Sequence, residues 1–193
     1  MRIEAVILAG GEGARMGGDK PSRRLGQGTL LDHVLARAFF WNLPCVLAVR
    51  DAEQGMIAPD LPLLLDEGGE GPIAGVAAAL RHAERESLDA VLTLPCDTPL
   101  LPVDLLGRLR DPVGTGALAA VASSGGRLHP SCALWSVKAA TALDDYLIEG
   151  RSLKGFAARL DACIVEWPVV PYDPFFNVNS ETDLAEAERL LRT

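Results

Sequence analysis

The sequence is 193 residues long, which fits one domain with a core large enough to need no disulfide or metal to hold it together. Hydrophobic residues make up 49% of the chain and charged residues 23%, an ordinary globular composition that excludes a disordered protein. The formal net charge of -8 argues against broad contact with nucleic acid, whose phosphate backbone is bound by a basic face. A small phosphate ligand needs only a few local donors and stays compatible with this charge.

Apolar runs and helical patterns alternate along the whole chain. The apolar runs predict strands at residues 3–8, 45–49, 61–65, 90–94, 117–122, 131–137 and 163–168. Helical spacing and start signals, with Thr29 and Ser180 as N-caps and Pro72 in a first turn, predict helices at residues 29–41, 71–85, 102–110, 138–148, 153–160 and 180–191. Residues 123–128 are predicted to form a turn. This alternation is typical of an α/β fold, so we expect a three-layer Rossmann-like architecture with a mostly parallel sheet, in a single domain over residues 1–193.

The start of the chain and its cysteines indicate where the protein works. The first four residues lead directly into a strand pattern without a signal-peptide layout, and no apolar stretch is long enough to span a bilayer. The cysteines, at positions 45, 96, 132 and 163, are scattered and show no zinc-type spacing to one another or to histidines. We interpret them as buried free thiols, and we expect a cytoplasmic protein with no membrane contact and no metal–thiolate site.

The first predicted strand ends in a glycine-rich loop that runs from Leu8 to Lys20. Successive glycines let backbone N–H groups turn inward and form a concavity for phosphate oxygens, and Arg15 and Lys20 add positive charge for a triphosphate. Two common phosphate loops are excluded, because Met16 replaces the third glycine of a dinucleotide fingerprint and Asp19 replaces the lysine of a Walker A loop. A solvated surface loop is the alternative, but the preceding strand and the two cations favour phosphate binding.

Two later strand exits carry oxygen donors, and ligands of open α/β sheets bind at such exits. Asp97 follows the strand at 90–94 and is well placed to hold Mg²⁺, a hard cation that prefers oxygen ligands shared with substrate phosphates. Its alternative role is to cap the helix near residue 102, for which Asp104 is closer. Asn179, just before the last helix, could give the same metal a second, neutral oxygen, although a role in starting that helix is about as compatible with its spacing.

Several motifs resemble one known family. Leu8-Ala9-Gly10-Gly11 and Arg15-Met16-Gly17-Gly18-Asp19-Lys20 resemble the signature loop of nucleotidyltransferases with a glycosyltransferase-A-like Rossmann sheet. The resemblance narrows to the molybdenum cofactor guanylyltransferases through Gly71-Pro72-Ile73-Ala74-Gly75, Pro95-Cys96-Asp97-Thr98-Pro99, His129-Pro130 and Asn177-Val178-Asn179. It covers the whole chain and implies Mg²⁺-dependent transfer of GMP from GTP to the terminal phosphate of molybdenum-bound molybdopterin, with release of pyrophosphate.

The resemblance also implies roles for single residues. Nucleotide contacts fall on Leu8, Ala9, Gly10, Lys20, Asp66, Gly71, Gly75 and Asp97, and Asp97 is the implied Mg²⁺ ligand. The residue chemistry adds Gly11 to the nucleotide contacts, Arg15 beside Lys20 and Asp97 as a catalytic group, and Asn179 as a second metal ligand. On the acceptor side we expect Arg127, His129 and Asn179, with Arg151 and Lys154 as helpers; the alternative is that Arg127 and His129 only shape a turn. The acceptor is a phosphate dianion, so it needs local cations in an acidic protein. Arg50 stands where family members often have Asn and is a candidate substitute for that contact. His33 and His82 are expected to be ordinary helix residues.

Three other functions compete with guanylyl transfer. The nearest is a cytidylyltransferase that uses CTP on the same pterin. A sugar-phosphate nucleotidyltransferase and a nucleotide-binding regulator without turnover are the others, and the set of Arg15, Lys20 and Asp97 argues against the regulator. For the enzyme we expect a monomer that makes transient contact with cofactor-delivery or target enzymes.

Overall fold

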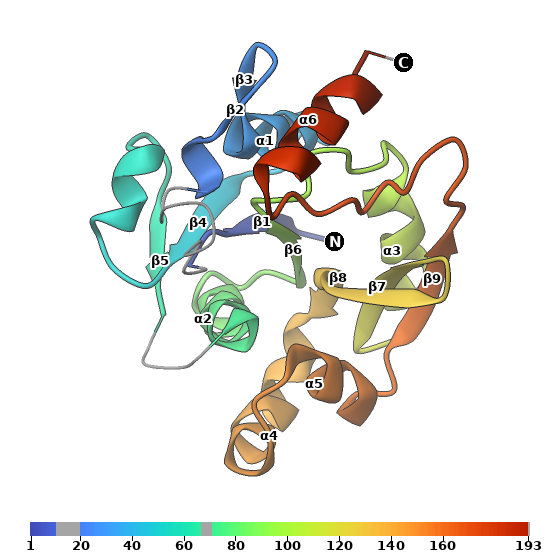
Figure 1. Ribbon diagram of the computed structural model, residues 1–193. Helices are drawn as coiled ribbons and strands as arrows, with labels where there is room; N and C mark the ends of the chain where they lie inside the picture. Colours follow the sequence, from blue (N-terminus) through green and yellow to red (C-terminus); the bar gives the residue numbers. More distant parts are fainter. Residues whose placement is uncertain (11–19, 67–70, 193) are drawn as a thin grey trace.

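The computed structural model describes residues 1–10, 20–66 and 71–192, and Figure 1 shows how their elements are arranged. The strands are β1 (Ile3–Leu8), β2 (Arg24–Leu25), β3 (Gly28–Thr29), β4 (Cys45–Val49), β5 (Leu63–Leu65), β6 (Ala90–Pro95), β7 (Ala119–Ser124), β8 (Arg127–Ser136) and β9 (Cys163–Trp167). The α-helices are α1 (Leu30–Phe40), α2 (Pro72–Arg85), α3 (Leu105–Gly114), α4 (Leu143–Glu149), α5 (Leu153–Arg159) and α6 (Glu181–Leu190). Short 3-10 turns lie at Lys20–Ser22, Gln54–Ile57 and Val137–Ala142.

The main sheet has the strand order β5-β4-β1-β6-β8-β7-β9. β1 pairs in parallel with β4 and β6, β4 with β5, and β7 with β9. β8 is antiparallel to both of its neighbours. The chain leaves β1 toward β4 and β5 on one side and returns to β6 on the other, so β1 marks a topological switch point, where open α/β sheets bind ligands. The expected mostly parallel sheet is confirmed.

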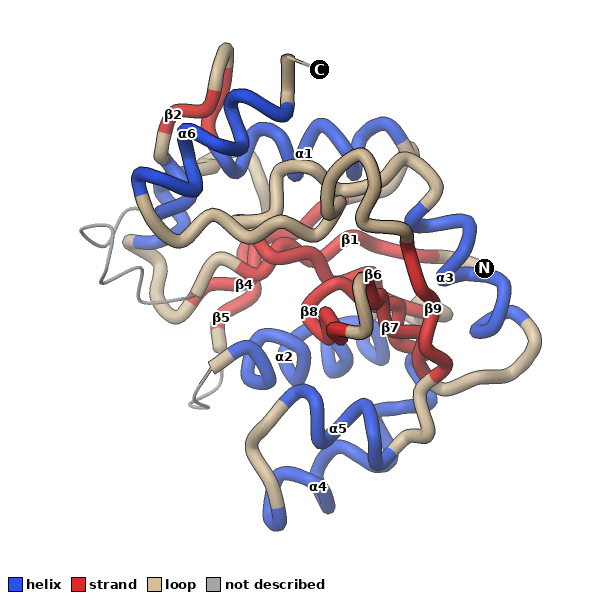
Figure 2. The backbone as a smooth tube through the Cα atoms, turned by 45° about the vertical axis from the view of Figure 1, so that its right-hand side comes forward, coloured by secondary structure: helices blue, strands red, loops and turns tan. Residues whose placement is uncertain are grey.

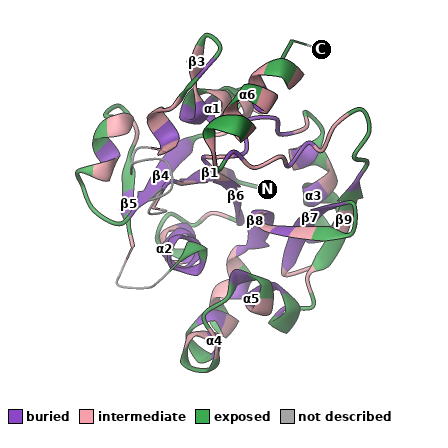
Figure 3. Ribbon diagram, viewed as in Figure 1, coloured by how far each residue is buried: buried purple, intermediate pink, exposed green. Residues whose placement is uncertain are grey.

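Helices cover both faces of this sheet, and the strands supply alternate side chains to each face (Figure 2). In β1, Ala5 and Ile7 pack with the α1 and α3 side. Val6 faces the opposite way, into the core under α2, α4 and α5. A small third cluster joins α6 to the β2–β3 ribbon. The buried residues therefore lie along the strands and the inner helix faces (Figure 3), which confirms the three-layer architecture.

Local capping chemistry sets the helix starts that the sequence predicts. The Thr29 side chain accepts from the N–H of Asp32 and the Asp32 carboxylate accepts from the N–H of Thr29, which forms a capping box for α1. Ser180 caps α6 in the same position, and Pro72 opens α2. These predictions are confirmed.

Several boundaries differ from the expectation by a few residues, and three differences have a clear structural cause. The helix expected at 102–110 begins only at Leu105; Asp104 stands at its N-cap position, but its carboxylate accepts from Trp167 Nε1 at 2.9 Å and makes no cap hydrogen bond. The expected helix at 138–148 is divided into a 3-10 turn and α4. The turn expected at 123–128 is a tight hairpin at Gly125 and Gly126, with φ of 55° and 74°, and β8 already starts at Arg127. Positive φ at both central residues suits the twist of a hairpin.

Cysteine burial follows the expectation at three positions and not at the fourth. Cys45, Cys96 and Cys132 are buried free thiols, whereas Cys163 is a free thiol that is exposed. The prediction of burial for Cys163 is wrong because β9 is an edge strand whose first residues face solvent. Among the described residues, no helix is both long and apolar enough to cross a membrane.

Candidate active site

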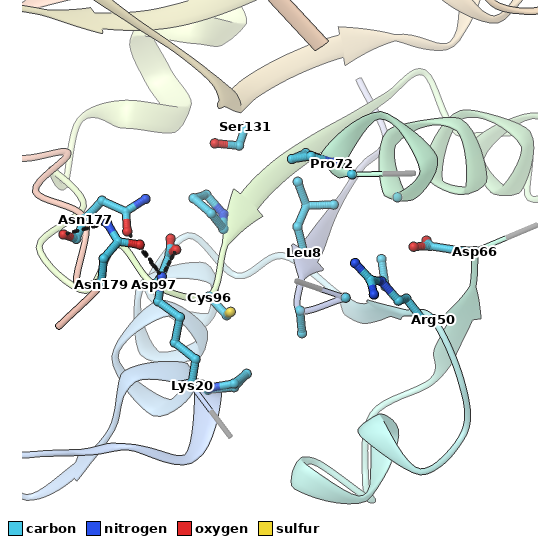
Figure 4. A pocket seen from close by; sticks show the side chains of 17 residues that line it. Leu8, Lys20, Arg50, Asp66, Pro72, Cys96, Asp97, Ser131, Asn177 and Asn179 are labelled. Atoms are coloured by element: carbon cyan, nitrogen blue, oxygen red, sulfur yellow. Dashed lines mark hydrogen bonds and ion pairs between the residues drawn. The ribbon is translucent and has the colours of Figure 1, made fainter. Parts of the chain in front are cut away.

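A pocket of about 410 Å³ lies at the carboxyl ends of β1, β4, β5 and β6. This volume is typical of small-molecule sites. The structure places nine predicted site residues on its wall: Leu8, Ala9, Gly10, Lys20, Asp66, Gly71, Gly75, Asp97 and Asn179. Gly11 and Arg15 lie outside the described residues. Figure 4 shows two polar ends of the pocket separated by Leu8, with Lys20 and Asp97 at one end and Arg50 and Asp66 at the other.

At the first end, the Lys20 ammonium is surrounded by three side-chain oxygens from two other parts of the chain. Lys20 Nζ lies 2.6 Å from Asp97 Oδ2, 2.7 Å from Asn179 Oδ1 and 3.5 Å from Asn177 Oδ1. Lys20 starts a short 3-10 turn, and Asp97 follows β6. The backbone N–H of Val178 donates to the Asp97 carbonyl at 2.9 Å, which holds the two asparagines beside the carboxylate. We name these side chains, Lys20, Asp97, Asn177 and Asn179, the cation cluster.

The donors of this cluster suit a hard cation. One carboxylate and two amide oxygens already surround a positive charge, and Mg²⁺ takes such oxygens together with substrate phosphates. Within the described residues, no three His, Cys, Asp or Glu side chains gather as a self-sufficient metal site. A metal here would therefore share its coordination sphere with a phosphate ligand. The sequence interpretation missed Asn177 as a donor; the signal was its spacing of two from Asn179, because residues two apart in extended backbone share a side.

At the second end, Asp66 presents an oxygen without a partner. Its Oδ1 is buried and accepts no hydrogen bond among the described residues. Burial raises the pKa of Asp66, and the nearby Arg50 guanidinium opposes that rise. A buried acceptor without a donor is costly, so this atom is suited to accept a hydrogen bond from a ligand. Arg50, the candidate substitute for the family Asn, lines the same end.

Glycines bring the backbone close to Asp66. A Cβ at Gly10 would stand 3.2 Å from Asp66 Oδ2 and 3.4 Å from Arg50 Cγ. A Cβ at Gly75, in the first turns of α2, would stand 2.8 Å from Leu8 Cδ2 and 3.7 Å from Asp66 Oδ1. These two positions leave room at the end of the pocket because they lack side chains.

Apart from Asn179, the predicted acceptor residues lie outside the pocket. His129 is only 8% exposed, its Nε2 is 2.7 Å from Ser124 Oγ, and its ring stacks on Phe175 at 4.7 Å. Burial lowers the pKa of His129, with the carboxylate of Asp173 acting against that shift. His129 does not line the pocket, and neither do the exposed Arg127, Arg151 and Lys154.

An irregularity in β8 explains where its side chains go. Val121 of β7 pairs with Ala133, whereas the next residue, Ala122, pairs with His129. Residues 130–132 thus have no partner on β7 and form a bulge. The bulge accommodates Pro130, which has no N–H to donate to a ladder. Ser131, inside this bulge, is the β8 residue that reaches the pocket, and sequence reasoning did not single it out.

His33 and His82 are helix residues outside the pocket, as expected. His82 Nε2 lies 2.6 Å from Glu4 Oε2, and His33 Nε2 lies 2.9 Å from the Leu25 carbonyl oxygen.

The switch-point pocket, with a cation cluster at one end and an acceptor at a glycine-lined end, defines a nucleotidyltransferase-type α/β enzyme. Residues 5–163 match the MobA-like NTP transferase domain family. The chain is 43% identical over 194 residues to a molybdenum cofactor guanylyltransferase of Cereibacter sphaeroides, with coverage of 100% of this chain and 98% of that protein. It therefore belongs to the molybdenum cofactor guanylyltransferase family, which confirms the resemblance seen in its sequence.

Solved structures agree with this assignment. The crystal structure of molybdopterin-guanine dinucleotide biosynthesis protein A from Archaeoglobus fulgidus is similar with a TM-score of 0.77 and 25% identity, covering 98% of both chains. A 2-C-methyl-D-erythritol 4-phosphate cytidylyltransferase from Thermus thermophilus shares the fold with a TM-score of 0.71 and 20% identity, covering 97% of this chain and 98% of that one. The same architecture thus serves relatives that differ in base and acceptor.

Proposed function

We propose that the protein transfers GMP from GTP to the terminal phosphate of molybdenum-bound molybdopterin and releases pyrophosphate. The observation that carries this proposal is the two-ended pocket, in a chain that is 43% identical over its whole length to a molybdenum cofactor guanylyltransferase. The cation cluster suits the triphosphate, and Asp66 suits the donor edge of a base.

The reaction is an in-line displacement at phosphorus. An oxygen of the pterin's terminal phosphate forms a bond to the α-phosphorus of GTP, and the bond from that phosphorus to the oxygen bridging to the β-phosphate breaks. The bridging oxygen leaves with the pyrophosphate. No covalent protein intermediate is needed, so the chain has to align the two phosphates and neutralise the charge that develops on the leaving group.

The cation cluster has the groups for this task. Lys20 would bind the phosphates, and Asp97 with Asn179 and Asn177 would hold Mg²⁺. When bound, Mg²⁺ supplies positive charge that stabilises the leaving pyrophosphate. The glycine-rich loop, with Gly11 and Arg15, is proposed from the sequence to add backbone donors and a second cation to the same phosphates.

The base end favours guanine over cytosine. Guanine carries adjacent N1–H and N2–H donors, which a carboxylate can accept together, whereas cytosine offers a carboxylate only its N4 amino group. The buried, unpartnered Asp66 Oδ1 is therefore matched better by guanine. Leu8, Ala9, Gly10, Gly71 and Gly75 line the space between this carboxylate and the cation cluster.

Pyrophosphate release tests the proposal most directly. The protein is incubated with molybdate-loaded molybdopterin, Mg²⁺ and GTP, CTP, ATP or UTP in turn. We expect release with GTP that requires both the pterin and Mg²⁺. Faster release with CTP would make the protein a cytidylyltransferase, and binding of GTP without any release would make it a regulator. Release with a sugar 1-phosphate in place of the pterin would move it to the sugar-phosphate nucleotidyltransferases.

We also propose that the enzyme acts in the cytoplasm as a monomeric single domain that meets delivery or target enzymes transiently. Three buried free thiols support a reducing compartment. On the acceptor side, Asn179 and the exposed Arg127 stay candidates for the pterin phosphate, whereas His129 has a different place in the structure. Light scattering on the purified protein should give the mass of a monomer. Thermal unfolding should show the single cooperative transition expected of one domain.

A further inference from the structure

The segment between β9 and α6, residues 168–179, runs past the end of the β7–β8 hairpin to the carboxyl end of β6 (Figures 1 and 2). We call it the strap. Two of its residues, Asn177 and Asn179, supply amide oxygens to the cation cluster. The strap has little regular structure of its own, so its contacts with the rest of the protein decide where these oxygens lie.

A chain of polar side chains fixes the middle of the strap to the hairpin. Asp173 Oδ1 accepts from Ser124 Oγ at 2.8 Å and from the backbone N–H of Phe175 at 2.9 Å. Because the Ser124 hydroxyl hydrogen goes to Asp173, the contact of 2.7 Å between Ser124 Oγ and His129 Nε2 requires the histidine to donate. The order of donation is thus His129 to Ser124 to Asp173, and it ends on a carboxylate, which strengthens each member.

A stack of rings fixes the same point of the strap. Phe175 is 3% exposed and lies between His129, at 4.7 Å, and Trp167, at 5.4 Å in an edge contact. Trp167 is itself held by α3, because its Nε1 donates to Asp104 and the Arg108 guanidinium lies 4.1 Å from its ring centre. His129 therefore contacts the strap twice, through Ser124 and through Phe175.

The far end of the strap is fixed to the catalytic carboxylate's own backbone. Val178 is fully buried, and its N–H donates to the Asp97 carbonyl at 2.9 Å. Asn177 and Asn179 flank it, and only two residues separate Phe175 from Val178. A loosened anchor at Phe175 would therefore displace the asparagine oxygens, and small misplacements at a reacting centre lower rates strongly.

We propose that Ser124, His129 and Asp173 are positioning residues, which hold the strap so that Asn177 and Asn179 face Asp97 and Lys20. His129 thus acts through the strap and does not contact the acceptor. The effect of these residues on catalysis rests on the proposed function, whereas their effect on the strap does not.

Hydrogen exchange and kinetics on matched variants test this inference. Ser124→Ala breaks the polar chain, and Asp173→Asn keeps an accepting oxygen but removes the charge on which the chain ends. His129→Phe keeps a ring on Phe175 but removes the donor. Ser152→Ala is the control, because it removes the cap of α5, where Ser152 Oγ accepts from the Gly155 N–H at 3.0 Å, on the side of the sheet away from the strap. Ser124→Thr, which keeps the hydroxyl, is the rescue variant.

We expect the Val178 amide to exchange about tenfold faster in both variants, since Ser124→Ala loses the hydrogen bond to the carboxylate and Asp173→Asn loses the charge that strengthens it. The kcat for pyrophosphate release should fall about tenfold while the KM for GTP stays within about twofold. The pattern in His129→Phe should be the same but weaker. Ser152→Ala should lower the melting temperature without changing Val178 exchange, and Ser124→Thr should restore both exchange and kcat.

Unchanged Val178 exchange in both Ser124→Ala and Asp173→Asn would overturn the inference. A raised KM for molybdopterin at unchanged kcat in His129→Phe would overturn it as well, and would make His129 an acceptor contact. If the wild-type protein released no pyrophosphate with any nucleotide, the proposed function would fail, and the exchange rates would still decide whether the strap is held as described. Asp173→Asn preserves the side-chain volume at a partly exposed position and should therefore fold. Its Val178 exchange rate tests the inference even if Ser124→Ala does not fold.

Discussion

The two ends of the pocket differ in whether their polar side chains already have partners within the protein. At the cation cluster, a positive charge already has oxygen partners: the Lys20 ammonium contacts Asp97 and Asn179 oxygens at 2.6 and 2.7 Å. At the other end, Asp66 Oδ1 is buried and has no hydrogen-bond partner in the part of the chain that the structure describes. The first end is ready for multiply charged phosphates because its charges are balanced and its donors are fixed in advance. The second end gains from a ligand that donates a hydrogen bond, since no donor within residues 1–10, 20–66 and 71–192 satisfies this acceptor. Catalytic power should thus depend on the first end, and base choice on the second.

The largest expected effect is at the cation cluster. Asp97→Asn keeps the shape of the side chain but removes the charge that Lys20 contacts and that we propose for holding Mg²⁺. The kcat for pyrophosphate release should therefore fall about 100- to 1000-fold at saturating GTP and Mg²⁺. Asp144→Asn, which loses an exposed ion pair with Arg81 on the far side of α2, is the matched control and should keep full activity. Full activity of Asp97→Asn would remove this carboxylate from the mechanism.

Asp66→Ala separates binding from stability at the second end. GTP affinity, measured by calorimetry, should fall about 10- to 100-fold, because a charge-assisted hydrogen bond is lost. The free protein should melt at a higher temperature, since the variant removes an acceptor that is buried without a donor. An unchanged GTP affinity would show that Asp66 does not bind the nucleotide.

The difference in affinity between GTP and CTP tests the base end of the pocket alone. Both nucleotides use the cation cluster, so the difference in their affinities isolates the base end. With Mg²⁺, GTP at 100 times its dissociation constant should stabilise the protein by about 2.7 kcal/mol. CTP at the same concentration should give a smaller rise in melting temperature, consistent with about tenfold weaker binding. Asp66→Ala should bring the two shifts together, and a larger shift with CTP would reverse the base assignment.

The smallest expected effect concerns pH. Burial lowers the pKa of His129 below its ordinary value, and the groups that act on it are Asp173 of the strap, Arg127 of β8 and Glu166 of β9. His129 therefore binds a proton more readily in the unfolded state than in the folded state. Its contribution to the free energy of unfolding thus falls as pH drops from about 7 to 5. The free energy of unfolding, measured by denaturant titration at each pH, should fall less steeply with acid in His129→Phe than in wild type. Parallel curves would show that His129 does not titrate in this range.

The sequence alone predicts most of the secondary structure, because the signals are local. The Thr29 capping box, the Pro72 helix start and the Ser180 cap each depend on residues within one turn. The pocket wall was predictable for a related reason: Leu8, Asp66 and Asp97 follow parallel strands, whose carboxyl ends meet at one edge of the sheet.

Sequence predictions were wrong or incomplete for residues whose surroundings come from distant parts of the chain. His129 was expected on the acceptor side, but its ring is buried against Phe175 of the strap, next to the bulge at residues 130–132. Cys163 looked like a core residue, but the strand order leaves β9 at an edge. Asp104 looked like a helix cap, and Trp167, 63 residues away along the chain, takes its carboxylate instead.

The sequence by itself thus determined the alternation of strands and helices, their caps, and the set of oxygen, nitrogen and glycine positions at the strand exits, because each is encoded within a few neighbouring residues. Only the tertiary structure decided which of these groups meet. Lys20 contacts Asp97 across 77 residues of chain and Asn179 across 159, and His129 reaches the strap through Ser124 and Phe175. Such contacts depend on strand order, register and the course of a loop, which are set by the packing of the whole sheet and its two helical layers.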